Sequence, residues 1–305
     1  MRVARNKNRL GISHVNCVTV HWEPGSGSGK WLPSMSMPEK EKTLVYLILG
    51  AAGSGRREVL FDLIEGDSGE SGRAVVMLEE GEGADEAEKK LGEIARWRWN
   101  SGGTIEAELP GGAAGKVFFV VNGRRNPVDQ VEAFRAWLPL QGAELGRIIC
   151  VVDCGLAERN PALLAWYDAC IHFSDVVLLN RREGVANKWV KDFQARYKDQ
   201  FFPCVIEFVR AGRVRNPPLI LDPSALRISQ AFEDEQTWVP VGGDPEDEAG
   251  DDEAADGDGE EVEMVLAEDP YFARRPGGRR AKEIPDIAKF LDAKQEAKAR
   301  AGSGD

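Results

Sequence analysis

The chain has 305 residues, 42% of them hydrophobic, and a formal net charge of −12 at pH 7. That apolar content is sufficient for a packed core, and no apolar stretch approaches the ~20 residues of a membrane-spanning helix, so we expect no membrane contact. The charge is concentrated in residues 244–263, which contain twelve acidic residues and no basic one. The rest of the chain is therefore close to neutral, and the net charge indicates no partner.

The N-terminal region and the cysteines bear on the cellular compartment. Residues 1–42 show little hydrophobic periodicity and predict a flexible leader, without the uninterrupted apolar segment of a secretory signal. A glycine-rich stretch at 25–30 imitates a phosphate-binding loop, but no strand precedes it. The five cysteines lie mostly in apolar runs. We expect a cytoplasmic protein with reduced, buried thiols rather than disulfides.

Residues 43–210 alternate short apolar runs with amphipathic segments. The runs are nearly continuous and rich in Val, Ile and Phe, as in strands covered on both faces, and they span 43–49, 73–78, 116–121, 147–153, 175–180 and 204–209. Helical stripes lie between them, at 128–138, 163–170 and 185–197. This alternation predicts a doubly wound α/β domain with a mostly parallel sheet, whose ligands bind at the carboxyl ends of the strands.

The charged segment 84–99 predicts a further, longer helix, with Leu91, Ile94 and Ala95 facing the core. Trp97 and Trp99 lie at its end. Helix packing explains one of these tryptophans but not both, so stacking on a base or a partner is an alternative role for the other.

A glycine-rich loop joins the first apolar run to an amphipathic segment. It comprises residues 50–57, with Gly50, Gly53, Ser54 and Gly55 in the turn. Backbone N–H groups of such a turn, at a helix N-terminus, bind phosphate. We therefore expect these residues to form a P-loop-type nucleotide site.

The loop departs from a P-loop at its last two positions. Lys followed by Ser or Thr is required there, to reach the outer phosphates and to hold Mg²⁺, but the chain has Arg56 and Arg57. We expect no Mg²⁺ binding, although two guanidiniums could still contact an anion directly. The alternative is that both arginines pair only with Glu58, Asp62 or solvent. If Arg56 binds phosphate, changing it to Ala should abolish the affinity.

Three later strand ends carry short motifs, NGRRNP at 122–127, VVD at 151–153 and NRRE at 180–183. With the loop at 50–57, their order resembles the CobW/HypB/UreG group of P-loop GTPases, most closely its CobW-like branch. The resemblance covers residues 43–210 and implies the fold of that group, with GTP or another nucleotide as ligand.

The resemblance also implies roles for single residues. Gly123 matches the family's third strand end, where the family's acidic and hydroxyl residues are absent from this chain. Asp153 matches the fourth strand end, as a group that supports the site or caps a loop. Asn180 and Arg181 would hold the base, and Glu183 stands where the family's Asp accepts guanine N–H groups. The extra methylene of Glu183 would weaken the preference for guanine.

The family's metal-binding motif, Gly-Cys-x-Cys-Cys, should fall between the second and third strands. Its best counterpart is GTIEA at 103–107, with none of the three thiols. A soft-metal site needs those thiolates, so we expect no zinc, and stoichiometric metal in the purified protein would contradict this expectation. Cys150 and Cys154 are interpreted as buried core residues rather than a metal pair.

The C-terminal third shows weaker periodicity. We expect an extension at 211–243, a disordered acidic linker at 244–263, where amide exchange should be rapid, and a basic tail with one helix at 264–305. The basic cluster between Arg274 and Lys282 has no accompanying folded basic surface. We therefore expect intramolecular or nonspecific pairing, and nucleic acid is an unlikely partner.

These features predict a noncatalytic or very slow CobW-like P-loop protein that binds a nucleotide or phosphate. It would act through contacts with a protein partner that the sequence does not identify. Two alternatives stay open: a GTP-hydrolysing protein of metallocentre assembly, in which another group replaces the missing Lys and hydroxyl, and a scaffold with an empty loop.

Overall fold

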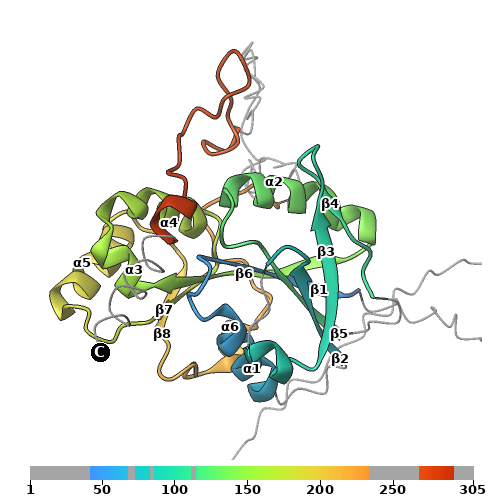
Figure 1. Ribbon diagram of the computed structural model, residues 1–305, viewed down its shortest axis with the longest axis horizontal. Helices are drawn as coiled ribbons and strands as arrows, with labels where there is room; N and C mark the ends of the chain where they lie inside the picture. Colours follow the sequence, from blue (N-terminus) through green and yellow to red (C-terminus); the bar gives the residue numbers. More distant parts are fainter. Residues whose placement is uncertain (1–41, 68–72, 83–85, 111–114, 234–267, 292–305) are drawn as a thin grey trace, which may run out of the picture. The chain divides into compact units, whose positions relative to one another are not determined.

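The structure is a computed structural model, and it describes residues 42–67, 73–82, 86–110, 115–233 and 268–291 (Figure 1). The predicted leader, the acidic linker and the end of the tail lie outside these residues. Within the described ranges, no helix combines the length and apolar character needed to cross a membrane.

One eight-stranded sheet forms the centre of the domain. Its order is β4-β3-β2-β5-β1-β6-β7-β8, and every neighbouring pair is parallel except β3 and β4. The strands are β1 (Leu44–Gly50), β2 (Arg73–Glu79), β3 (Glu93–Trp99), β4 (Ile105–Glu106), β5 (Gly115–Val120), β6 (Glu144–Asp153), β7 (Val176–Asn180) and β8 (Val205–Phe208). The central β1 lies between β5 and β6, so its carboxyl end adjoins theirs.

Helices cover both faces of this sheet, as the sequence predicted. The α-helices are α1 (Arg56–Gly66), α2 (Pro127–Trp137), α3 (Cys154–Arg159), α4 (Leu164–His172), α5 (Asn187–Lys198) and α6 (Pro217–Ile220). The short 3₁₀ helices are η1 (Glu86–Lys90), η2 (Leu138–Gln141) and η3 (Pro161–Leu163). Buried residues of α1 and α6 belong to one apolar cluster and those of α2, α3, α4 and α5 to the other, so the domain is doubly wound (Figure 1).

The predicted helix at 84–99 is wrong. The segment contains η1 and then β3, which pairs in parallel with β2. Trp97 is buried, stacks on Phe119 with ring centroids 4.9 Å apart, and donates its indole N–H to the Val120 carbonyl. Trp99 lies two residues further along the strand, and its ring centroid is 6.5 Å from that of Trp97. Because the two residues are two positions apart in a strand, both rings pack on the same face of the sheet. The charge pattern of the segment suits a helix, but burial in the tertiary structure favours the strand.

Part of the C-terminal tail is packed onto the domain. Tyr271, Phe272, Ile287 and Leu291 are buried in the same apolar cluster as α4. In the basic cluster, Arg280 pairs with Asp129 and Glu132 of α2. The expected intramolecular pairing is therefore present within the described part of the tail.

Candidate functional site

The loop between β1 and α1 has the backbone conformation that its glycines allow. Gly50, Gly53 and Gly55 have φ values of 135°, 78° and 87°. Residues other than glycine rarely adopt positive φ values of this kind, because their Cβ atom would clash with the backbone. The turn therefore depends on glycine at these positions. The loop leads directly into α1, whose first residue is Arg56, and this is the arrangement that orients backbone N–H groups toward an anion.

The loop after β5 lies directly against this turn. The Ala52 N–H donates to the Gly123 carbonyl over 3.0 Å. A Cβ added at Gly123 would lie 2.2 Å from the Ala52 nitrogen. Gly123 is therefore required by the close approach of two backbone segments. Gly123, which was predicted from the family resemblance to lie at a strand end, therefore contacts the glycine-rich loop directly.

Arg56 is buried and fully engaged within the protein. It is 5% exposed, and its guanidinium donates to the Val121 carbonyl and to the carboxylate of Glu82. The predicted alternative partners Glu58 and Asp62 are wrong for this residue, since Glu58 pairs with Arg181 and Asp62 accepts the Val214 N–H. Glu82 was missed because it is 26 residues from Arg56 in the sequence.

Arg57 extends the same buried network. Its Nη2 lies 3.1 Å from Glu88 Oε1 and 3.5 Å from Glu82 Oε2. Glu88 also accepts from Arg96 over 2.7 Å. The position that would hold Mg²⁺ through a hydroxyl thus carries a guanidinium between two carboxylates, and the loop does not fit a magnesium ion held in that way.

The expectation that neither Mg²⁺ nor zinc binds stays a prediction. In the described part of the chain, no group of three or more His, Cys, Asp and Glu side chains is placed to hold a metal ion.

Asn180 lies at the end of β7 and connects that strand end to the glycine loop by a hydrogen bond. Its side-chain Nδ2 donates to the Ser54 carbonyl over 2.8 Å. A Cβ on Gly55 would lie 2.3 Å from that nitrogen, so Gly55 also permits this contact. Ser54 itself is completely buried, and its N–H donates to the Ala51 carbonyl over 3.1 Å within the turn.

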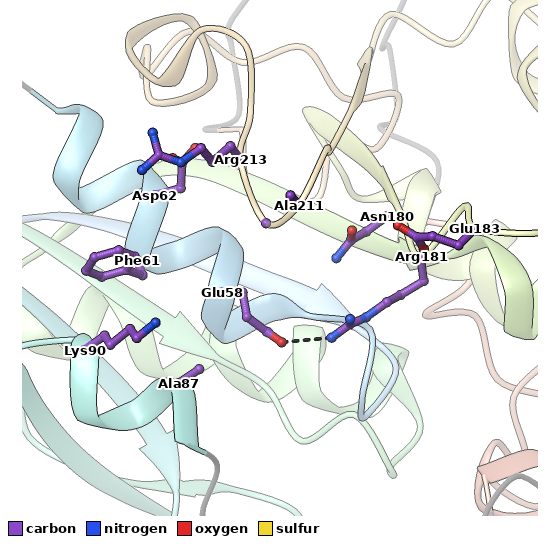
Figure 2. A pocket seen from close by; sticks show the side chains of 11 residues that line it. Glu58, Phe61, Asp62, Ala87, Lys90, Asn180, Arg181, Glu183, Ala211 and Arg213 are labelled. Atoms are coloured by element: carbon purple, nitrogen blue, oxygen red, sulfur yellow. Dashed lines mark hydrogen bonds and ion pairs between the residues drawn. The ribbon is translucent and has the colours of Figure 1, made fainter. Parts of the chain in front are cut away.

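Arg181 and Glu183 lie on the exposed side of the same strand end (Figure 2). Arg181 pairs with Glu58 of α1 over 2.8 Å. Together with Asn180 they line a cavity of about 360 Å³, within the range of small-molecule sites. The structure therefore brings together the three residues predicted to hold a base.

Other parts of the cavity wall were not predicted from the sequence. They are Phe61 on α1, Ala87 and Lys90 on η1, and residues 211–213 after β8 (Figure 2). The end of β8 could have been found, because ligands of such sheets bind where parallel strands end. The residues of η1 could not, because that segment was predicted as part of a longer helix.

Asp153 supports the neighbouring strand end. It is buried and its Oδ1 accepts the Leu156 N–H over 2.8 Å, which caps α3. Burial, together with the adjacent charge of Asp153, raises the pKa of the Cys154 thiol to about 12. Cys154 is therefore a neutral thiol rather than a thiolate ligand. The prediction that Cys150 and Cys154 are buried is confirmed.

The strand order and the glycine turn together define the class of this domain. The central β1, flanked by β5 and β6, leads through that turn into α1 at the carboxyl edge of a parallel sheet. This is a doubly wound α/β domain of the P-loop NTPase-like fold.

Comparisons with known proteins add little to this assignment. No family model matches the chain, and no curated protein matches it. Among solved structures, a zinc-bound triple mutant of the YjiA GTPase is similar at 15% identity with a TM-score of 0.40, over 61% of this chain and 62% of that chain. The zinc-bound YjiA GTPase from E. coli is similar at 15% identity with a TM-score of 0.39, over 60% and 62%. The likeness thus spans less than two thirds of the YjiA chains.

Proposed function

We propose that this chain is a degenerate P-loop protein that binds a nucleotide through the base end of its site, does not hydrolyse it at an appreciable rate, and acts through contacts with another protein. The observation that carries this proposal is the pairing of Arg56 with Glu82, both buried, and of the half-buried Arg57 with Glu82 and Glu88. Both positions on which a P-loop depends for phosphate and metal are engaged inside the protein.

The lack of turnover follows from the chemistry of phosphoryl transfer. That reaction is catalysed by positioning and by neutralising charge on the transferred group, and a metal ion bridging the phosphates supplies much of the neutralisation. Arg56 cannot supply it while its guanidinium is held by Glu82 and the Val121 carbonyl. Arg57 brings no hydroxyl for a metal.

Nucleotide binding is supported by the other end of the site. The cavity is open, and Asn180, Arg181 and Glu183 line it at a strand end. An exposed carboxylate at Glu183 can accept N–H groups of a base, and the Phe61 ring offers an apolar surface.

Titration of labelled GTP, ATP and GDP, each with and without Mg²⁺, tests the proposal. We expect binding that does not depend on Mg²⁺ and no release of phosphate above the buffer rate. Binding that requires Mg²⁺ and is followed by turnover would instead establish a GTPase. Failure of all three nucleotides to bind would establish a scaffold.

A matched pair of variants locates the ligand. Glu183→Ala should weaken nucleotide binding by about tenfold, because it removes a charged hydrogen-bond acceptor. Glu108→Ala removes another exposed carboxylate, away from the cavity, and should leave the affinity unchanged. Equal affinities of the two variants would contradict the assignment of the base end.

A further inference from the structure

Glu82 is a buried carboxylate that bridges the two arginines of the glycine loop. It follows β2, and its side chain is 7% exposed. One oxygen accepts from Arg56 and the other lies 3.5 Å from Arg57 Nη2. Glu82 thus places an anionic group between the two guanidiniums, hydrogen-bonded to Arg56 and ion-paired with Arg57, where a phosphate group could otherwise accept from the same donors.

A phosphate group on this loop would compete directly with Glu82. It would have to displace the carboxylate from Arg56 and leave Glu82 without its partner. Breaking a buried ion pair by removing one partner is strongly unfavourable, because an uncompensated charge stays behind. Glu88 belongs to the same network, since it pairs with Arg57 and Arg96. Glu79, whose carbonyl accepts the Glu82 N–H, pairs with Arg125, so a triphosphate would also approach further carboxylates.

The cavity beside the loop differs from the loop in being open to solvent, and the charges of its wall also balance. Its wall carries three acidic and three basic side chains, which are Glu58, Asp62, Glu183, Lys90, Arg181 and Arg213. Their formal charges cancel, so the wall offers no excess positive charge to a polyanion. Figure 2 shows the basic and acidic groups distributed around the opening, with the Phe61 ring on α1 among them. Such a wall suits a neutral, hydrogen-bonding, partly aromatic ligand.

We infer that Glu82 takes the place of a phosphate group in this protein, and that the cavity therefore accepts a purine nucleoside in preference to a nucleoside triphosphate. This inference rests on the proposed function, since it names the ligand class of the same site. Each added phosphate lowers the affinity, because it must enter a loop whose positive charge is already neutralised from within.

Isothermal titration calorimetry of the full chain tests the inference. The ligands are guanosine, adenosine, GMP, GDP, GTP and inorganic pyrophosphate, and the proteins are the unmodified chain, Glu82→Gln and Glu80→Gln. In Glu82→Gln the new amide oxygen can still accept from Arg56, but the anion is gone. Glu80 is a matched control, because it lies two residues away with its side chain 50% exposed and pairs with Arg98 over 3.3 Å.

In the unmodified chain we expect one of the two nucleosides to bind at least as tightly as its triphosphate. In Glu82→Gln we expect pyrophosphate and GTP to bind about tenfold more tightly, with the nucleoside unchanged. Glu80→Gln should behave as the unmodified chain. If Glu82→Gln does not fold, as judged by circular dichroism, Glu82→Asp retracts the carboxylate by one methylene and should show a smaller gain for pyrophosphate.

Two results would overturn the inference and they differ from each other. In the first, the unmodified chain binds the triphosphate tenfold more tightly than the nucleoside, and changes at Glu82 do not affect this difference. That result would contradict the inference but would be compatible with the proposed function. Absence of binding by every nucleoside and nucleotide sinks the proposed function and the ligand class together. In that case a gain of pyrophosphate binding in Glu82→Gln still shows that Glu82 occupies the phosphate position.

Discussion

The proposed nucleotide site has two ends, which use the same kinds of side chain in opposite ways. The phosphate end is the glycine loop with Arg56, and the base end is the cavity beside Arg181. At the phosphate end, Arg56 is 5% exposed and held by a buried carboxylate. At the base end, the Arg181 side chain is 47% exposed and pairs with Glu58, whose side chain is 38% exposed. Burial raises the cost of losing a charged partner, whereas water compensates for the loss at an exposed pair. The phosphate end is thus a structural element of the fold, and the base end is left free to change.

The largest expected effect tests the structural role of the phosphate end. Arg56→Ala should lower the free energy of unfolding by about 3–5 kcal/mol, because Glu82 would stay buried without a partner. Urea denaturation measures it. Replacing both residues, as Arg56→Met with Glu82→Leu, should restore most of the loss. Arg98→Ala, whose side chain is 66% exposed, should change little. Equal losses for Arg56→Ala and Arg98→Ala would remove the distinction between the two ends.

A smaller loss is expected where the loop backbone meets the β5 end. Gly123→Ala should destabilise the fold by about 1–3 kcal/mol, because its methyl group would overlap the backbone of residues 51 and 52. Gly81→Ala is the control, since the nearest atom to a methyl group there is 4.0 Å away. Thermal unfolding of both variants measures the difference, and an unaffected Gly123→Ala protein would show that the two loops separate easily.

A third region, away from both ends of the site, contains a pH-dependent contact around Asp269. Its effect on stability can be compared with the effects at the two ends. Burial raises the pKa of Asp269, but hydrogen bonds from His172, Ser229 and the Tyr271 N–H outweigh it, so its pKa lies below the ordinary 3.8. The folded state therefore releases this proton more readily than the unfolded state. The stabilisation is present above the ordinary pKa and is lost as the pH falls through the lowered value.

Asp269→Asn should remove this part of the acid sensitivity and cost about 1–2 kcal/mol at neutral pH. Urea midpoints measured from about pH 7 down to about pH 2 test it, because the loss is expected below the ordinary pKa of 3.8. Asp199→Asn, at an exposed position, is the control and should keep the acid sensitivity of the unmodified chain. A parallel pH profile for the two variants would contradict the assignment.

The smallest effect is expected at the base end. Arg181→Ala should change the free energy of unfolding by less than about 1 kcal/mol, because its ion pair with Glu58 is exposed to solvent. The variant is compared with Arg56→Ala in the same denaturation series. A loss as large as that of Arg56→Ala would show that the base end is also part of the structural core.

Much of the fold could be predicted because its signals are local. Continuous apolar runs correspond to β1, β2, β5, β6, β7 and β8, and the stripe at 128–138 corresponds to α2. The prediction for the segment at 84–99 failed because its charged residues alternate with apolar ones in a way that suits both a helix and a strand. Only pairing with β2 and burial of Trp97 decide between them.

The sequence by itself determined the glycine turn, the strand ends around it and the absence of a lysine–hydroxyl pair, because each depends on residues adjacent in the chain. The tertiary structure alone decided what Arg56 and Arg57 do. Glu82 reaches Arg56 from beyond β2, a strand separated from β1 by β5 in the sheet. Charges so far apart in sequence become partners only when the sheet order places them together, and burial then determines how firmly they are held.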